Sequence, residues 1–271
     1  MALLRRKDNP EARMSLGDHF REFRRRALVA VLAILIAAIV GWVKFDVLYE
    51  WLVGPIKDLQ TQRHNENINL NWGGKGVTGA FNVKLKVSMW VGLILASPVW
   101  LWQIWGFLAP GLTKKEKRIS RIVVAAAVPL FLLGCWVSTF ALPNAVRFLL
   151  GVTPGDAVNL PDANTYIAFV TRFILAFGIA FLLPVFLVGL NTAGVLPARV
   201  MIKGWRVAVM VIFVFAALMS PSPDAWSMLA LAFPMVGLFY LACGISAILD
   251  RRKKKERPQW LDVPDDHAST M

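Results

Sequence analysis

The sequence has few of the residues from which catalytic and metal sites are built. Its 271 residues include three histidines, His19, His64 and His267, which are too widely separated to suggest a metal cluster. The two cysteines, Cys135 and Cys243, both fall inside apolar runs, with neither metal-ligand spacing nor the surroundings of an exposed thiol. We expect both to be small core residues, and we expect no metal and no cofactor.

Charged residues are also scarce. They make up 17% of the chain, whereas 57% is hydrophobic and the mean hydropathy is +0.56. This composition is not that of a soluble protein and predicts an integral membrane protein. The net charge of +13 alone would suggest a nucleic-acid partner, but Lys and Arg concentrate in short connections between apolar runs. Membrane topology explains that pattern better, so we expect no nucleic acid.

Six apolar runs are candidates to cross a bilayer, because a spanning helix needs about 20 mostly apolar residues. We predict an all-α protein with one transmembrane domain over residues 1–250 and a basic, then polar tail over 251–271. The last two spans are expected to be short, because a tight turn joins them. The expected spans are 27–43, 85–107, 119–142, 166–190, 201–218 and 225–249.

Six spans place both termini on one side of the membrane. With the termini in the cytoplasm, most of the 30 Lys and Arg residues fall on that side, as the positive-inside rule requires. We therefore expect a multi-pass protein of the cell (cytoplasmic) membrane with cytoplasmic termini. The loop after the third span is expected to begin at Pro143.

Several prolines are expected to bend or end helices. Pro98, Pro129 and Pro184 fall inside expected spans, where a proline removes one backbone hydrogen bond. Between the first two spans, an amphipathic helix over 47–53 is expected to stop at Pro55, because proline disfavours helix in the residue before it.

The spans contain almost no ionisable residues near their middle. Arg172, Lys84 and Lys86 are expected near the outer interface, where long side chains can reach water. This pattern disfavours a proton-coupled transporter or pump. The chain also shows no metalloprotease motif, paired membrane aspartates or nucleophile with a positioned base, so we expect no enzymatic activity.

Two carboxylates remain on the expected cytoplasmic side, each among cations. Glu22 lies in an arginine run within 20–27, which is expected to form a short amphipathic helix along the membrane surface, and Glu116 lies in the basic segment 114–118. In one interpretation each balances neighbouring charge, as Glu22 would with Arg26 four residues later. In the other, the two carboxylates recognise two consecutive arginines of a ligand through paired hydrogen bonds.

Three motifs occur along the chain in a fixed order. They are H-F-R-E-F-R-R-R at 19–26, W-Q-I-W-G-F-L-A-P-G-L at 102–112 followed by Glu116, and S-P-S-P-D at 220–224. In this combination the chain resembles TatC, the multispanning receptor of the twin-arginine protein translocase, from about residue 14 to residue 249. The resemblance implies that folded cargo with twin-arginine signal peptides is bound at the cytoplasmic face of a bacterial membrane. It also implies export driven by the proton gradient, in an oligomeric complex with TatA- and TatB-type single-span partners.

The resemblance further implies roles for single residues. Glu22 and Glu116 match positions that contact the arginine pair of the signal peptide, with Arg24 in the same site. Phe107 matches the aromatic residue beside it. His19 is expected to be a surface helix residue rather than a ligand, and its place beside the site means that its protonation could modulate binding there.

Other matched positions imply structural or docking roles. Pro55, Pro98 and Asp224 match residues interpreted as structural supports or as parts of translocon function. Leu182 and Tyr240 stand where many family members carry a glutamate, and a partner helix could dock there on the Tyr240 hydroxyl. Two other functions stay open: a solute transporter with a polar cavity near mid-membrane, and an insertase for membrane proteins.

Overall fold

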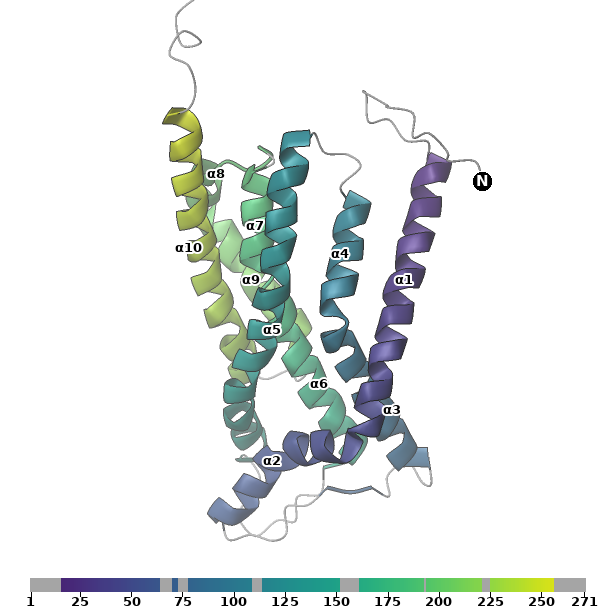
Figure 1. Ribbon diagram of the computed structural model, residues 1–271. Coiled ribbons are helices and arrows are strands. Elements are labelled where there is room, and N and C mark those ends of the chain that lie inside the picture. The colour runs from purple at the N-terminus through teal and green to yellow at the C-terminus, as the bar shows by residue number, and fades with distance from the viewer. Residues whose placement is uncertain are drawn as a thin grey trace, which may run out of the picture.

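The computed structural model describes residues 16–63, 70–72, 78–108, 114–151, 161–192, 194–220 and 225–255. The regular elements within these ranges are all helices, and most run along a common direction as one bundle (Figure 1). They are α1 (Leu16–Val43), α2 (Phe45–Arg63), α3 (Gly79–Leu95), α4 (Ser97–Leu108), α5 (Lys114–Gly151), α6 (Ala163–Ala180), α7 (Leu183–Thr192), α8 (Ala198–Lys203), α9 (Trp205–Met219) and α10 (Ala225–Lys255).

The predicted all-α membrane architecture is confirmed. Four helical stretches are long and apolar enough to cross a membrane, the bent pair α3–α4 makes a fifth, and α9 is a shorter apolar helix of 15 residues. The prediction of a short last span is wrong, because α10 has 31 residues and continues past the expected end at 249. That all six segments cross the bilayer stays a prediction.

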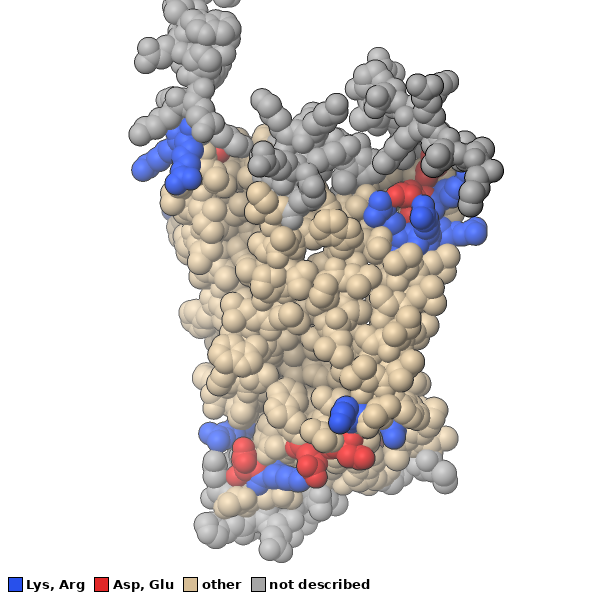
Figure 2. Space-filling model, viewed as in Figure 1, with Lys and Arg blue, Asp and Glu red and all other residues tan. Residues whose placement is uncertain are grey.

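The two ends of the bundle differ in what they carry. α1 begins and α10 ends at the same end, which also holds the end of α4 and the start of α5; we call it the terminal end (Figure 1). α2 lies across the opposite end, which we call the distal end. Figure 2 shows Lys and Arg side chains at the terminal end, a wide belt without charged residues, and a second charged layer at the distal end.

The arginine run does not form a separate surface helix, which corrects the expectation for 20–27. α1 is continuous over 28 residues from Leu16 to Val43. Nothing in this stretch breaks a helix, and the apolar side chain of Phe23 packs against α4 through Phe107. The charged turns are therefore a rigid extension of the first apolar helix.

Two further helices continue through prolines at which we expected them to end. α2 runs through Pro55 because that residue is buried and its neighbours Leu52, Val53 and Ile56 pack into the core. The Tyr166 hydroxyl donates a 2.9 Å hydrogen bond to the Leu52 carbonyl, close to where proline interrupts the helical ladder.

α5 likewise continues through Pro143 to Gly151, where a loop was expected. Leu142, Ala145 and Val146 are buried around this proline. Their burial favours continued helix by more than the single hydrogen bond that proline removes.

The expected bend at Pro98 is present. α3 and α4 meet at an angle of 60° at Ala96, two residues before this proline. The Trp100 indole donates a 2.9 Å hydrogen bond to the Leu93 carbonyl on the other side of the bend. α6 and α7 are separated at 181–182, just before Pro184, but together they form one apolar stretch, Ala163–Thr192, without a bend as sharp as that of α3 and α4. α5 is not interrupted at Pro129.

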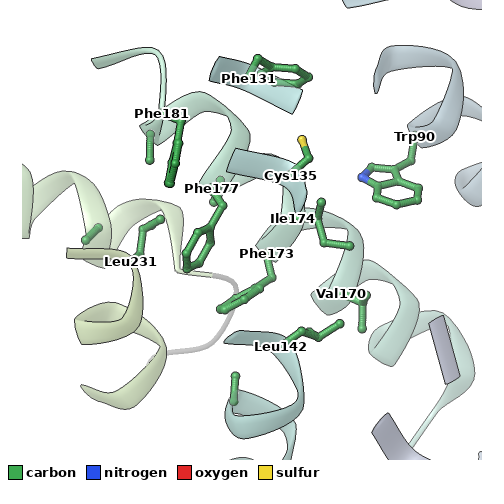
Figure 3. Close-up of a cluster of buried hydrophobic side chains, with 14 of the residues drawn as sticks. Trp90, Phe131, Cys135, Leu142, Val170, Phe173, Ile174, Phe177, Phe181 and Leu231 are labelled. Carbon is green, nitrogen blue, oxygen red and sulfur yellow. The ribbon is translucent and has the colours of Figure 1, made fainter. Parts of the chain in front are cut away.

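The core is centred on α6. Figure 3 shows its Phe173, Phe177 and Ile174 beside Phe131 and Cys135 of α5, and all five are buried. Close approach of α5 and α6 depends on small residues, since a Cβ on Gly178 would lie 2.7 Å from the Cys135 sulfur. Both cysteines are buried and free, as predicted.

α1 is held to the bundle mainly by α3. Gly92 of α3 lies so close to α1 that a Cβ there would be 2.6 Å from the Ile34 carbonyl oxygen, and Gly41 of α1 meets the Ser88 backbone in the same way. Much of the rest of α1 exposes large apolar side chains, as a lipid-facing helix does. This packing fixes the charged first turns of α1 beside α4.

Candidate functional site

One face of α1 is turned toward the end of α4. Glu22 and Phe23 lie three and four residues after His19, and Arg26 lies four and three residues after them, so helical periodicity places the four on a common face. All four contact the last two turns of α4 or one another. The candidate site is the junction of these two segments at the terminal end.

An aromatic cluster closes one side of the junction. The Phe107 ring stacks on the His19 imidazole with 4.3 Å between ring centroids, and it meets the Phe23 ring edge-on at 5.5 Å. Such pairs contribute about 0.5–1.5 kcal/mol beyond their buried area. The cluster ties the end of α4 to the first turns of α1.

Glu22 is paired within its own helix. Arg26 Nη2 lies 2.6 Å from Glu22 Oε1, and Arg26 Nε donates to the same oxygen at 2.8 Å. The Glu22 side chain is 28% exposed. Both bonds use one carboxylate oxygen, and among the described residues the other oxygen, Oε2, accepts no hydrogen bond.

The Arg26 guanidinium also bridges to α4. Its Nη1 donates to Gln103 Oε1 at 3.3 Å. It lies directly against Gly106, where any Cβ would collide with it. Glycine at this position therefore leaves the space in which the guanidinium reaches both Glu22 and Gln103.

A small cavity opens beside this ion pair. Its volume is about 220 Å³, and it is lined by Glu22, Arg25, Arg26, Val29 and Gln103. One acidic and two basic residues thus line a pocket large enough for a side chain.

Comparisons with known proteins match nearly the whole chain. The family model described as Sec-independent protein translocase protein (TatC) matches residues 18–234. The chain is 39% identical over 240 residues to the Sec-independent protein translocase protein TatC of Xylanimonas cellulosilytica, covering 89% of this chain and 86% of that protein. It is 40% identical over 252 residues to the protein of the same name from Rothia mucilaginosa, covering 93% and 85%.

The chain belongs to the TatC family. A crystal structure of the twin arginine translocase receptor TatC superposes with a TM-score of 0.69 at 29% identity, covering 85% of this chain and 98% of that one. The TatC fold is therefore shared along almost the whole chain. It follows that the protein is a multi-pass membrane component of the Sec-independent protein translocase.

Three of the predicted site residues meet at one place on this TatC fold. His19, Glu22 and Phe107 lie together at the junction of α1 and α4. Arg24 is exposed and is not among the residues that line the cavity. Glu116 lies in the first turn of α5, at the same terminal end, but its side chain lies outside the described residues.

The predicted supports and docking positions are more scattered. Pro55 is buried in α2 and Pro98 lies at the bend between α3 and α4, whereas Asp224 lies outside the described residues. Leu182 is partly buried against the core. The Tyr240 side chain is 50% exposed, and among the described residues its hydroxyl makes no hydrogen bond.

Sequence reasoning missed the α4 side of the junction. In the sequence, Gln103 and Gly106 stood only as members of the 102–112 motif. In the structure, Gln103 accepts a hydrogen bond from Arg26, and Gly106 leaves the space that the Arg26 guanidinium occupies. The sequence did indicate a role for Gln103, because the rest of α4 is apolar apart from Ser97 at its start. A lone amide four residues before Phe107 shares its helix face and therefore points toward the same neighbour.

Proposed function

We propose that this TatC family member binds the twin-arginine signal peptides of folded cargo at the terminal end of the bundle. The peptide's arginines would bind Glu22 and Glu116, with Phe107, His19 and Arg24 around them. The observation that carries the proposal is the partly exposed Glu22, which lies in a cavity and has one unoccupied carboxylate oxygen.

The resident ion pair supports recognition of arginine rather than of positive charge in general. Arg26 already holds Glu22 through two N–H groups of a planar guanidinium, so the carboxylate is oriented for that geometry. A ligand arginine can add to Oε2 or replace Arg26 with bonds of the same kind. A lysine ammonium is a compact point charge and lacks the planar edge of paired N–H groups that a guanidinium offers.

Glu116 supplies a second carboxylate at the same end of the bundle. It is the third residue of α5. α5 starts at the end of the bundle where α4 stops (Figure 1). Two acids on neighbouring helices fit two consecutive arginines.

The test is binding of a signal peptide carrying Arg-Arg or Lys-Lys to purified protein. Glu22→Gln and Glu116→Gln keep side-chain size and remove charge, and each is expected to weaken Arg-Arg binding by about tenfold or more, since breaking a charged hydrogen-bonded pair costs roughly 1.5–3 kcal/mol. Glu50→Gln, an exposed acid of α2 at the distal end, is the matched control and should bind normally. Unchanged affinity and unchanged discrimination in both site variants would refute the proposal.

We also propose that TatA- and TatB-type single-span proteins dock on this chain for export driven by the proton gradient. Tyr240 favours this role over Leu182, because Tyr240 is half exposed on α10 and its hydroxyl has no partner among the described residues. A photo-crosslinker at 240 should capture a single-span partner in membranes, and one at the partly buried 182 should capture less. Equal capture at both positions, or at neither, would contradict this docking point.

A further inference from the structure

A second cavity lies at the distal end, between the starts of α3 and α6 and the end of α5. Its volume is about 470 Å³. Its walls are partly apolar, with Val146, Leu149, Leu150 and Phe169, and two cations, Lys86 and Arg172, also line it. Its place in the bundle separates it completely from the junction of α1 and α4.

Arg172 lies farther along its helix than the sequence suggested, and its side chain is exposed. We expected it in the first turns of a span starting at 166, but α6 begins at Ala163. At a rise of 1.5 Å per residue, Arg172 is about 14 Å along the helix from its start. An ionised side chain within a spanning segment carries a free-energy cost unless a partner compensates its charge. Arg172 therefore requires such a partner.

Among the described residues, the groups around these two cations are neutral. Lys86 Nζ donates to Asn164 Oδ1 at 3.0 Å, and this buried amide is fixed by a 3.4 Å bond to the Gly79 carbonyl. Arg172 makes no ion pair or hydrogen bond among the described residues, and none of the described lining residues is acidic. Asp162, nearby in sequence, accepts hydrogen bonds from Thr165 as the cap of α6.

We propose that this cavity binds the phosphate group of an anionic phospholipid. Lys86 and Arg172 would hold the phosphate, and the acyl chains would lie along the apolar side chains of α5 and α6. A phosphatidylglycerol-type headgroup fits best, because a choline or ethanolamine headgroup would bring a third cation beside the other two. Binding would keep Arg172 charged without an acidic residue from the protein.

The alternative occupant is an acidic side chain of a partner helix. A lipid is favoured because the cavity combines two cations with apolar walls at one end of the bundle, which matches a headgroup with attached chains. A partner helix needs a long apolar face instead, of which the cavity offers only a short part.

The experiment is native mass spectrometry of the full chain with equal amounts of phosphatidylglycerol and phosphatidylcholine. Wild-type protein should retain phosphatidylglycerol preferentially. Lys86→Gln and Arg172→Gln should each reduce that preference by about fivefold, the effect expected per cation near a lipid surface. Arg147→Gln is the matched control, because Arg147 is exposed on α5 but does not line the cavity.

A conservative variant, a soluble competitor and a photo-crosslinker distinguish lipid binding from the alternatives. Arg172→Lys keeps the charge and should keep the preference, which guards against loss of folding in Arg172→Gln. Glycerol phosphate should compete only weakly, and full competition would show a phosphate site without a lipid role. The proposal is overturned if folded Lys86→Gln and Arg172→Gln both bind lipid like wild type. It is equally overturned if a photo-crosslinker at 149 captures a protein and no lipid.

Discussion

At the scale of single residues, the junction of α1 and α4 depends on one arginine with two tasks. Arg26 occupies Glu22 and at the same time bridges to Gln103 on the neighbouring helix. The two interpretations of Glu22, charge balance and ligand recognition, therefore do not exclude each other. The intrahelical pair that charge balance predicts is present, and it holds the carboxylate in the geometry that an incoming arginine would use.

This arrangement predicts that Arg26 competes with the ligand. Arg26→Gln should bind an Arg-Arg signal peptide about fivefold more tightly, because removing a partly exposed pair worth about 1 kcal/mol frees Glu22 and removes a repelling charge. Titration of labelled peptide measures the effect. Arg21→Gln, which removes an exposed arginine that does not line the cavity, should show little change. If Arg26→Gln weakens binding as much as Glu22→Gln, Arg26 positions Glu22 and does not compete.

At the scale of elements, one carboxylate joins three helices at the terminal end. Asp250 Oδ2 accepts the Ala198 N–H at the start of α8 at 2.9 Å, and the Asn191 side-chain amide of α7 donates to both Asp250 oxygens at 3.1 and 3.2 Å. Asn191 also donates to the Leu196 carbonyl at 3.1 Å. The sequence placed Asp250 only at the end of the expected transmembrane domain, beside the basic tail, whereas it lies within α10 and fixes the connection from α7 to α8.

Asp250→Ala should therefore destabilise the bundle. Loss of charge-assisted hydrogen bonds of this kind costs about 2 kcal/mol, and the buried Asn191 amide would lose its main acceptor. Thermal unfolding in detergent measures the loss. Asp58→Ala, an exposed acid of α2, is the matched control. Equal unfolding temperatures for the two variants would show that the connection is held by packing alone.

At the scale of the whole molecule, the sequence predicted the helices well because bilayer thickness fixes the length of each apolar run. It failed where packing outweighs a local rule, as at Pro55 and Pro143, whose buried neighbours keep the helix continuous. It also missed Gln103 and the position of Arg172 along α6. Those features depend on which helices become neighbours, which no local pattern specifies.

Labelling of introduced cysteines tests the orientation of the whole bundle, because the two native cysteines do not interfere. Both are buried, so the wild-type protein gives little background with a membrane-impermeant thiol reagent. Arg252→Cys places an exposed thiol at the terminal end, and Glu50→Cys places one at the distal end. With cytoplasmic termini, intact cells should label only Glu50→Cys, and Arg252→Cys should react after the membrane is opened. Labelling of Arg252→Cys in intact cells would put the α1 and α4 junction on the wrong side for cytoplasmic cargo.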